Sequence, residues 1–497
     1  MSTQKVTRRP LVLACVMLAM FMGAIEATIV ATAMPAIAAD LGDFSLYSWV
    51  FSSYLLMNAV TVLIYGKLSD VFGRKPMITF GIIVFLVGSI LSGLAESMTM
   101  LILFRFLQGF GAGAVLPMAT TIVGDLYTKE ERAKIQGYLS SVWGISAVLG
   151  PAIGGILVEQ FSWEYVFWLN VPIGLVALVG IQVFFHENMP VREKQKVDVP
   201  GAVLLTIGLI SFMYVLVEGG VGFAWLSVQA LLFIAVALVA ITLFVLVERR
   251  QPAPILPFSL WKRKSIFIAN MVSLTTGVIL IGISSFLPPF VQGVLGASPI
   301  VAGFTLTTMS IGWPIASTVA GSLLLKIGER ATACIGGVSL VVGSLFFVLL
   351  NGTSSPLHAA AGSFFVGIGM GLTSTAFIVS IQSTVPWHER GVATAANMFM
   401  RSMGTTIGAA LLGGIVNSIV MQKVSTSDTE TPLTVDSINL LLSDEVGSSL
   451  PAQDERLLLD AFTNGLDVVY WIVLGCSVIS MLWMLRLPRA HKQKEVA

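Results

Sequence analysis

The stretch Gly66-Lys67-Leu68-Ser69-Asp70-Val71-Phe72-Gly73-Arg74-Lys75-Pro76 decides the fold of this chain. It is a short, charged segment between two strongly apolar runs, 46–65 and 77–95. Runs of that length and apolarity indicate membrane-spanning helices. Because the connection is short and carries three basic residues, it predicts an antiparallel helix hairpin whose loop lies on the cytoplasmic side.

Four residues of this stretch carry its chemistry. Gly66 and Gly73 permit tight turning, and Asp70 and Arg74 can each hold a helix end or an opposite charge. The full stretch closely resembles the loop signature of the major facilitator superfamily, which lies between the second and third spans of that family. The resemblance implies a polytopic transporter fold.

Composition also indicates a membrane protein. Apolar residues make up 56% of the 497 positions and charged residues 11%, a balance that no soluble globular protein tolerates. The apolar runs are continuous, which predicts an all-α protein rather than a β-barrel. The first run contains Glu26 and no small-residue cleavage pattern, so we expect no cleavable signal peptide. Cys15, Cys334 and Cys476 lie in apolar runs and predict neither a disulfide framework nor a metal site.

Length and apolarity predict fourteen transmembrane helices. They cover residues 11–36, 46–65, 77–95, 99–123, 134–158, 164–185, 199–218, 226–247, 265–291, 300–325, 332–350, 358–382, 391–421 and 466–486. With the N-terminus inside, most of the 28 Lys and Arg residues fall in the termini and the inner loops. The exceptions are Arg105 and Arg401 within spans, and Lys423 and Arg456 in an outer loop. This distribution predicts cytoplasmic termini and a multi-pass protein of the cell membrane.

The chain also repeats itself. At nearly constant offsets, the second half repeats glycines and charges of the first: Phe106, Gly109, Gly111 and Gly113 as Phe364, Gly367, Gly369 and Gly371; Glu131-Arg132 as Glu389-Arg390; Gly150 and Gly155 as Gly408 and Gly413; Gly66 and Gly73 as Gly321 and Gly328. We therefore predict two six-helix bundles in parallel orientation, 1–186 and 265–497, with a linker and an inserted two-helix hairpin at 187–264. Duplicated bundles usually bind substrate near the midplane, between the halves.

The segment 422–465 is predicted to form a long outer loop. It is strongly acidic, and apolar patterning at 438–442 and 456–462 predicts two short amphipathic helices. One interpretation is a solvated surface cap. The other is a lid, or a rim that attracts cations to the outer mouth.

Glu26 and Arg105 are ionisable residues inside predicted spans. Each such charge costs about 3 kcal/mol or more and therefore indicates a function. Glu26 lies about 22 Å from the inner end of its helix, and Arg105 about 9 Å from the outer end of a helix that runs inward. At this similar depth the two side chains can pair. The carboxylate can carry a proton as water access alternates between the sides, or the two residues form a static ion pair that joins two helices.

Five stretches match the motifs of one transporter subfamily. They are Ile25-Glu26-Ala27-Thr28-Ile29-Val30 through Met34-Pro35, Arg105-Phe106-Leu107-Gln108-Gly109, Gly144 through Gly150-Pro151-Ala152-Ile153-Gly154-Gly155, Trp163-Glu164-Tyr165-Val166-Phe167, and Asn170-Val171-Pro172-Ile173-Gly174. In this order they resemble the fourteen-span drug:proton antiporters of the EmrB/QacA type. Glu26 stands where aspartate is usual in that family, and Glu164 stands where arginine is usual. Carboxylate chemistry survives at Glu26, whereas the role of Glu164 stays open.

The resemblance implies roles for these motifs. The arginine of the fourth-span motif, here Arg105, is implicated in proton coupling, with Glu26 as the proton-carrying carboxylate. The fifth-span motif implies a hinge that resists leakage, formed by Gly144, Gly150, Pro151, Gly154 and Gly155. Small residues at this spacing can equally serve close helix packing alone.

The same resemblance implies an inner latch, formed by Gly66, Asp70, Gly73, Arg74 and Asp125. Asp125 would pair with Arg74. Asp70 would face the N-terminus of the span that begins near Gly391, where a carboxylate suits the positive end of a helix. The alternative to a latch that opens is a rigid staple.

Polar residues within other spans are candidates for a substrate cavity: Tyr54, Asn58, Gln108, Asn397 and Arg401. Tyr54 and Asn58 are four residues apart and share a helix face. Arg401 lies about 15 Å deep in its span, where it can bind an anionic group, repel protons or pair with Glu26. Each neutral residue could instead make an interhelical hydrogen bond.

Together these patterns predict a proton-coupled multidrug efflux antiporter that works by alternating access and exports amphipathic, often cationic, compounds. The alternatives are a dedicated exporter of one endogenous metabolite or a lipid, and a non-transporting membrane sensor. The sequence has no Walker loop, metal-ligand cluster or Ser/His/Asp set, so we expect no enzyme. We expect a monomer with no cofactor other than the coupling proton. Its partners would be small amphipathic substrates and membrane lipids, with no nucleic acid and no metal.

Overall fold

The computed structural model describes residues 7–42, 46–187, 198–219, 223–251, 254–425 and 451–488. Within these ranges the chain is helical, with one isolated bridge between Gly219 and Phe223 and no β-sheet. Thirteen of the described helical segments are long and apolar enough to cross a membrane. The prediction of an all-α polytopic protein is therefore confirmed.

The chain forms two compact units. Unit 1 comprises Met1–Ala269 and Phe377–Phe399, and unit 2 comprises Asn270–Ala376 and Met400–Ala497. The division of the chain at residues 186 and 264 that the sequence suggested remains a prediction.

Unit 1 contains most of the helices. They are α1 (Arg9–Leu41), α2 (Tyr47–Phe72), α3 (Arg74–Ser92), α4 (Met98–Leu126), α5 (Lys129–Gln160), α6 (Glu164–Trp168), α7 (Asn170–Phe184), α8 (Val199–Glu218), α9 (Val228–Glu248), α10 (Phe258–Lys262) and the short η3 (Trp387–Glu389). Unit 2 contains η2 (Phe290–Val294), α12 (Pro299–Val348) and α16 (Ala452–Leu485). Three helices contribute residues to both units: α11 (Lys264–Pro289), α13 (Pro356–Thr384) and α14 (Arg390–Ser425).

The stretch 66–76 is not the loop that its charges and glycines suggested. The helix α2 continues to Phe72 and α3 begins at Arg74, so Gly73 alone interrupts the helical conformation. Its φ of 100° lies in the left-handed region, which glycine adopts without strain. The loop prediction was wrong because charged residues are compatible with the end of a helix, and only Gly73 requires another conformation.

The helix α12 repeats this interruption in unit 2. It consists of two helices that meet at Gly328, which has a φ of 80°. These two parts correspond to the predicted spans 300–325 and 332–350. Because Gly73 and Gly328 are also related by the sequence repeat, the conformation agrees with a duplicated bundle.

Close helix contacts repeat in the same way. A Cβ atom at Gly109 would collide with the carbonyl oxygen of Tyr54, and one at Gly367 with that of Met309. Two further contacts pair Gly113 with Asn58 and Gly371 with Trp313. Thus α4 packs on α2 in unit 1 as α13 packs on α12 in unit 2, through glycines that allow the backbones to approach.

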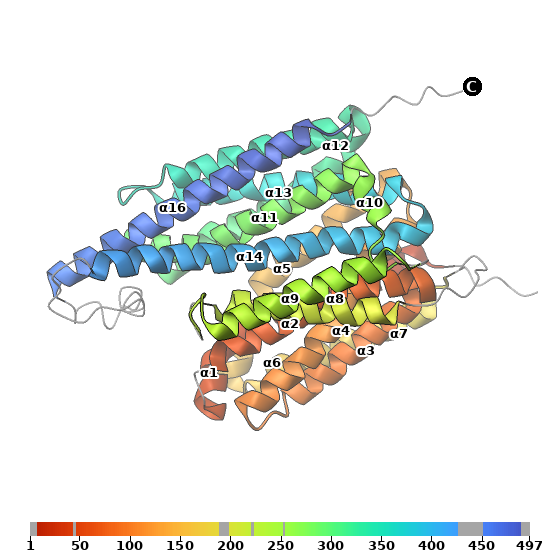
Figure 1. The fold of residues 1–497 in the computed structure, drawn as a ribbon, viewed down its shortest axis with the longest axis horizontal. Coiled ribbons are helices and arrows are strands. Elements are labelled where there is room, and N and C mark those ends of the chain that lie inside the picture. The colour runs from red at the N-terminus through yellow and green to blue at the C-terminus, as the bar shows by residue number, and fades with distance from the viewer. Residues whose placement is uncertain are drawn as a thin grey trace, which may run out of the picture. The chain divides into compact units, whose positions relative to one another are not determined.

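The predicted hairpin between the bundles is formed by α8 and α9, which lie side by side in unit 1 (Figure 1). Asp198 caps α8 by accepting a hydrogen bond from the backbone N–H of Gly201. On its other side α8 packs on α2, where the rings of Trp49 and Tyr214 are 5.6 Å apart. The hairpin is therefore attached to unit 1 through α8.

The helices that flank the acidic segment are longer than predicted. The helix α14 ends at Ser425 and α16 begins at Ala452. The predicted short helix 456–462 is therefore the start of α16 and not a separate element. The other predicted helix, 438–442, lies outside the described residues.

Candidate functional site

A buried ion pair lies in the interior of unit 1. Glu26 of α1 and Arg105 of α4 pair directly, with exposed fractions of 0% and 1%. The predicted pairing of these two residues is confirmed. A buried pair of this kind is strongly destabilised when one partner is removed, because the remaining charge is left uncompensated.

The guanidinium of Arg105 has several further contacts. Its Nη1 donates to Gln108 Oε1 at 2.7 Å, and its Nε donates to the carbonyl oxygen of Val50 at 3.1 Å. The ring centroid of Tyr54 lies 4.4 Å from Arg105 Cζ, a cation–π distance. Two predicted cavity residues, Tyr54 and Gln108, therefore position the charge of Arg105.

Asn170 and Ser89 complete the surroundings of Glu26. Asn170 Nδ2 donates to Glu26 Oε2 at 2.5 Å and lies 3.1 Å from Ser89 Oγ. Ser89 Oγ also accepts from Gln108 Nε2 at 3.1 Å. Sequence reasoning missed both contacts, although Asn170 opens a recognised motif. We define the Glu26 cluster as Glu26, Tyr54, Ser89, Arg105, Gln108 and Asn170.

The Glu26 cluster can respond to a single proton. Ionised Glu26 neutralises Arg105, whereas protonated Glu26 would leave the guanidinium uncompensated in an apolar interior. Asn170 Oδ1 is buried and has no hydrogen-bond partner among the residues that the structure describes. An amide with a free acceptor beside the carboxyl group can reorient to accept a hydrogen bond from the protonated carboxyl group.

A second charged cluster joins the ends of α2 and α4 to the start of α14, all within unit 1. Arg74 pairs with Asp70 at 2.8 Å and with Asp125 at 3.0 Å. Asp125 also pairs with Arg390 at 3.0 Å. The ring centroid of Trp387 lies 4.1 Å from Arg74 Cζ. We define the Arg74 cluster as Asp70, Arg74, Asp125, Trp387 and Arg390.

Asp70 binds the N-terminus of α14. Its two carboxylate oxygens accept hydrogen bonds from the backbone N–H groups of Gly391 at 3.0 Å and Val392 at 2.9 Å. The predicted contact is confirmed, and it satisfies N–H groups that a helix start leaves without partners. A Cβ atom at Gly66 would collide with that of Ala395, so Gly66 is required for this approach of α2 to α14.

Sequence reasoning did not assign Arg390 and Trp387 to this cluster. Arg390 also donates to the carbonyl oxygens of Gly124 at 3.1 Å and Gln382 at 3.0 Å, and the carbonyl oxygen of Trp387 accepts from Arg74 at 2.8 Å. The available signal was the repeated Glu-Arg pair, because Arg390 is the counterpart of Arg132.

The glycine motif of α5 faces α1. A Cβ atom at Gly150 would collide with the side chain of Thr28, and one at Gly154 with that of Thr32. Thr28 also donates to the carbonyl oxygen of Ser146 at 3.1 Å. Gly155, by contrast, has no atom within 4 Å of its Cβ position. Gly144 and Pro151 lie on the same helix. These contacts establish close packing, and the hinge role stays a prediction.

Three predicted cavity residues lie outside the two clusters. Asn58 is half-buried on α2. Asn397 donates to the carbonyl oxygen of Ala269 at 3.1 Å, which is the interhelical hydrogen bond considered as its alternative. Arg401 belongs to unit 2, where its Cζ lies 5.9 Å from the ring centroid of Trp313.

A carboxylate and a guanidinium enclosed by long apolar helices are typical of a membrane transporter, since ionisable groups within spans often mark transport pathways. The chain belongs to the Major Facilitator Superfamily, whose sequence profile matches residues 16–409. It is therefore a multi-pass membrane transporter and not an enzyme.

Two relatives come from Bacillus subtilis (strain 168). The chain is 36% identical to "Multidrug transporter protein MdtP" over 417 residues, which cover 83% of this chain and 76% of that protein. It is 33% identical to "Multidrug resistance protein 3" over 499 residues, which cover 99% and 97%. Among solved structures, the human organic anion transporter MFSD10 (TETRAN) matches with a TM-score of 0.66 and 12% identity, over 96% of this chain and 99% of that one. At this identity the match shows the fold alone.

Proposed function

We propose that this protein is a proton-coupled multidrug efflux antiporter of the fourteen-span EmrB/QacA type, located in the cell membrane with both termini in the cytoplasm. The names of its Bacillus relatives refer to multidrug transport and resistance, which supports export of diverse amphipathic, often cationic, compounds. Thirteen candidate spans in the described ranges, one of them divided at Gly328, support the count of fourteen. The protein acts as a monomer and needs no cofactor besides the proton.

The observation that carries the proton coupling is the buried pair of Glu26 and Arg105. In the ionised state Glu26 forms an ion pair with Arg105 of α4 and accepts a hydrogen bond from Asn170 of α7. A proton on Glu26 removes the charge that balances Arg105 and one acceptor of Asn170. Contacts between α1, α4 and α7 then change together. Two conformations that differ in these contacts bind the proton with different affinities, so protonation shifts the equilibrium between them.

The Arg74 cluster acts as the latch in this mechanism. Its ion pairs and the two hydrogen bonds from α14 to Asp70 hold the start of α14 against α2 and α4. Water access from this side requires these contacts to break. A charged, well-bonded cluster favours one discrete arrangement over intermediate ones, which suits a transporter that alternates between two states.

Proton release from proteoliposomes tests the proposal. Cationic dyes are added to wild type and to Glu26→Gln, and counterflow of the same dyes is followed in parallel. We expect wild type to exchange dye for protons, and Glu26→Gln to keep counterflow but lose uphill transport. If Glu26→Gln still pumps uphill, the proton is carried elsewhere. If wild type moves no dye, the protein is a dedicated carrier of one metabolite or a lipid.

A further inference from the structure

Arg401 of α14 is a charged side chain within a span that the proton mechanism does not use. In the described part of the chain no carboxylate lies within 4.0 Å of it, in contrast to Arg105 and Arg74. A guanidinium has five N–H donors. The five donors of Arg401 make no hydrogen bond to the described residues, whereas Arg105 donates to a carboxylate, an amide and a backbone carbonyl.

The position of Arg401 is fixed by packing and not by ion pairs. A Cβ atom at Gly277 of α11 would collide with the carbonyl oxygen of Arg401, so its backbone is held tightly against α11. Its guanidinium lies beside the ring of Trp313 on α12, at 5.9 Å from the centroid. Both Arg401 and Trp313 are half-buried. Because a charged guanidinium within a span is costly without a polar partner, that of Arg401 requires water or a polar ligand.

The two side chains together present one positive charge beside one aromatic face. A carboxylate, sulfonate or phosphate can accept two parallel hydrogen bonds from a guanidinium. The ring of Trp313 can contact an apolar or aromatic group attached to that anion. The pair is therefore complementary to an amphipathic anion and not to an amphipathic cation.

We propose that Arg401 and Trp313 bind the negatively charged group and the adjoining ring of an anionic or zwitterionic substrate. This inference rests on the proposed export function and deepens it, because it adds a substrate class to the cationic compounds. Arg401 contacts the substrate directly, while Glu26 and Arg105 couple the proton.

A pair of fluorescent compounds that differ in one group tests the site. A rhodamine with a free carboxylate is compared with its methyl ester, and binding to purified protein in detergent is followed by fluorescence anisotropy. We expect Arg401→Gln to weaken binding of the free acid by about tenfold or more, as for loss of a charged hydrogen-bonded pair, and to leave the ester unchanged. Arg401→Lys keeps the charge without the fork geometry and should retain part of the affinity.

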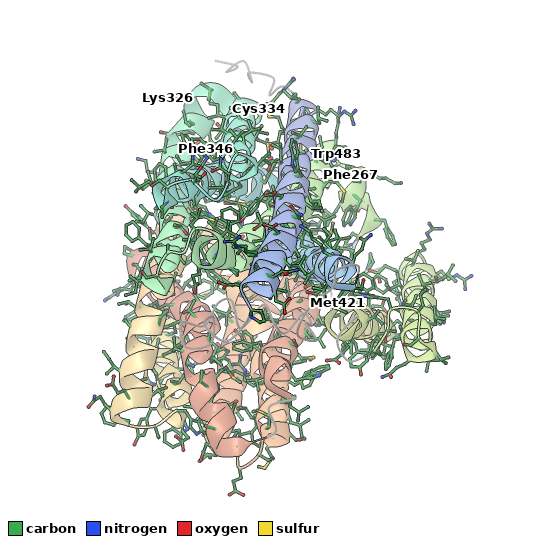
Figure 2. All side chains as sticks on the ribbon, turned by 90° about the vertical axis from the view of Figure 1, so that its left-hand side faces the viewer. Phe267, Lys326, Cys334, Phe346, Met421 and Trp483 are labelled. Carbon is green, nitrogen blue, oxygen red and sulfur yellow. The ribbon has the colours of Figure 1, made fainter. Side chains whose placement is uncertain are left out.

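The chain provides a matched control at the end of α16. Arg486 Cζ lies 5.5 Å from the ring centroid of Trp483, which is an arginine–tryptophan pair of similar geometry in unit 2. Figure 2 labels Trp483, which lies in the last turn of α16. Arg486→Gln should change binding of neither compound.

Several results would overturn the proposal. Equal losses of acid and ester in Arg401→Gln would show that Arg401 only supports the fold, and no loss would show that it does not bind the anion. A wild type that binds neither compound, or only the ester, would also show that Arg401 does not bind the anion. Competition by added phosphatidylglycerol would assign the guanidinium to a lipid phosphate. The proposed export function is tested by a separate measurement, proton-driven uptake of the ester in proteoliposomes. Absence of that uptake would contradict the export function and not the anion site.

Discussion

The two repeats of the chain agree in their glycines and differ in their charges. By the offset that relates Gly109 to Gly367, Arg105 of the first repeat corresponds to Ser363 of the second. Ser363 is fully buried, and its hydroxyl has no partner within the described ranges. The glycines thus mark what the fold requires in both copies, and the charges mark what one copy does.

Two positions compared by the offset that relates Gly73 to Gly328 show the same contrast. Ser89 of the Glu26 cluster corresponds to Ser344, and where Ser89 contacts Asn170, the hydroxyl of Ser344 lies 2.7 Å from that of Ser477. Asp70 corresponds to Leu325, which cannot accept hydrogen bonds from a helix N-terminus. The second repeat therefore retains the packing at these positions with neutral side chains.

The largest expected effect comes from breaking the charge balance in the first repeat. Arg105→Ala should lower the free energy of unfolding by about 3–5 kcal/mol, because Glu26 is left buried without a counter-charge. Ser363→Ala should cost less than about 1 kcal/mol, since the hydroxyl that it removes has no partner. Denaturant unfolding in detergent measures both values.

A double variant sharpens this test. Combining Glu26→Gln with Arg105→Ala removes both charges, so the loss should be smaller than for Arg105→Ala alone. If the double variant is instead as unstable as the sum of the single variants, the two residues do not stabilise each other as an ion pair.

The next effect should be the same in both repeats. Gly109→Ala and Gly367→Ala each place a methyl group against a backbone carbonyl, of Tyr54 and Met309 respectively. Each should lower the free energy of unfolding by about 1–3 kcal/mol, as for other overpacked helix contacts. Thermal unfolding in detergent checks the equality. Gly155→Ala is the control, because its Cβ position is open and alanine favours the helix. A loss in only one repeat would contradict the assigned equivalence.

A smaller effect separates the repeats at the end of α2 and before the interruption of α12 at Gly328. Asp70→Asn keeps one acceptor oxygen for the start of α14 but loses the charge that binds Arg74. We expect about 1–2 kcal/mol less stabilisation of the closed latch, hence a roughly tenfold change in the initial export rate from vesicles. Leu325→Ala at the equivalent position should leave the rate unchanged. An unaltered rate in Asp70→Asn would leave the rigid staple as the better interpretation.

Part of the Glu26 cluster could be predicted from the sequence, because the rise per residue of a helix converts residue number into depth in the membrane. That reasoning paired Glu26 with Arg105. It could not find Ser89 or the contact of Asn170, since neutral polar residues are common in spans and their partners depend on helix rotation. Arg390 was also missed as a partner of Asp125, because the two residues come from distant helices that no local pattern connects.

Boundaries were less predictable than spans. Residues 66–72 continue α2, although their charges resemble those of a loop. The start of α16 at Ala452 was interpreted as a separate short helix because its acidic residues lower the apolarity of the window. In both places a helix extends beyond the apolar core, where hydropathy no longer indicates its end. The fold class therefore follows from composition, whereas the end of α2 depends on the local backbone conformation of Gly73.

The smallest expected effect concerns Glu187, whose carboxylate caps α3. It accepts hydrogen bonds from the backbone N–H groups of Arg74 at 2.8 Å and Lys75 at 2.9 Å. Among described residues, the equivalent chain end after α16 offers no carboxylate to the second half of α12. Burial raises the pKa of Glu187 above its ordinary value of 4.5, and the two hydrogen bonds only partly oppose that rise.

A carboxyl group with a raised folded-state pKa contributes stability that is fully present below pH 4.5 and is lost as the pH rises through the higher folded-state pKa. The difference in free energy of unfolding between wild type and Glu187→Gln should therefore fall over that window and stay constant above it. Titrations common to both proteins cancel in this difference. Denaturant unfolding at a series of pH values measures it, with the exposed Glu131→Gln as control. A difference that rises with pH would mean that the hydrogen bonds from α3 outweigh burial, which would make Glu187 an ordinary helix cap.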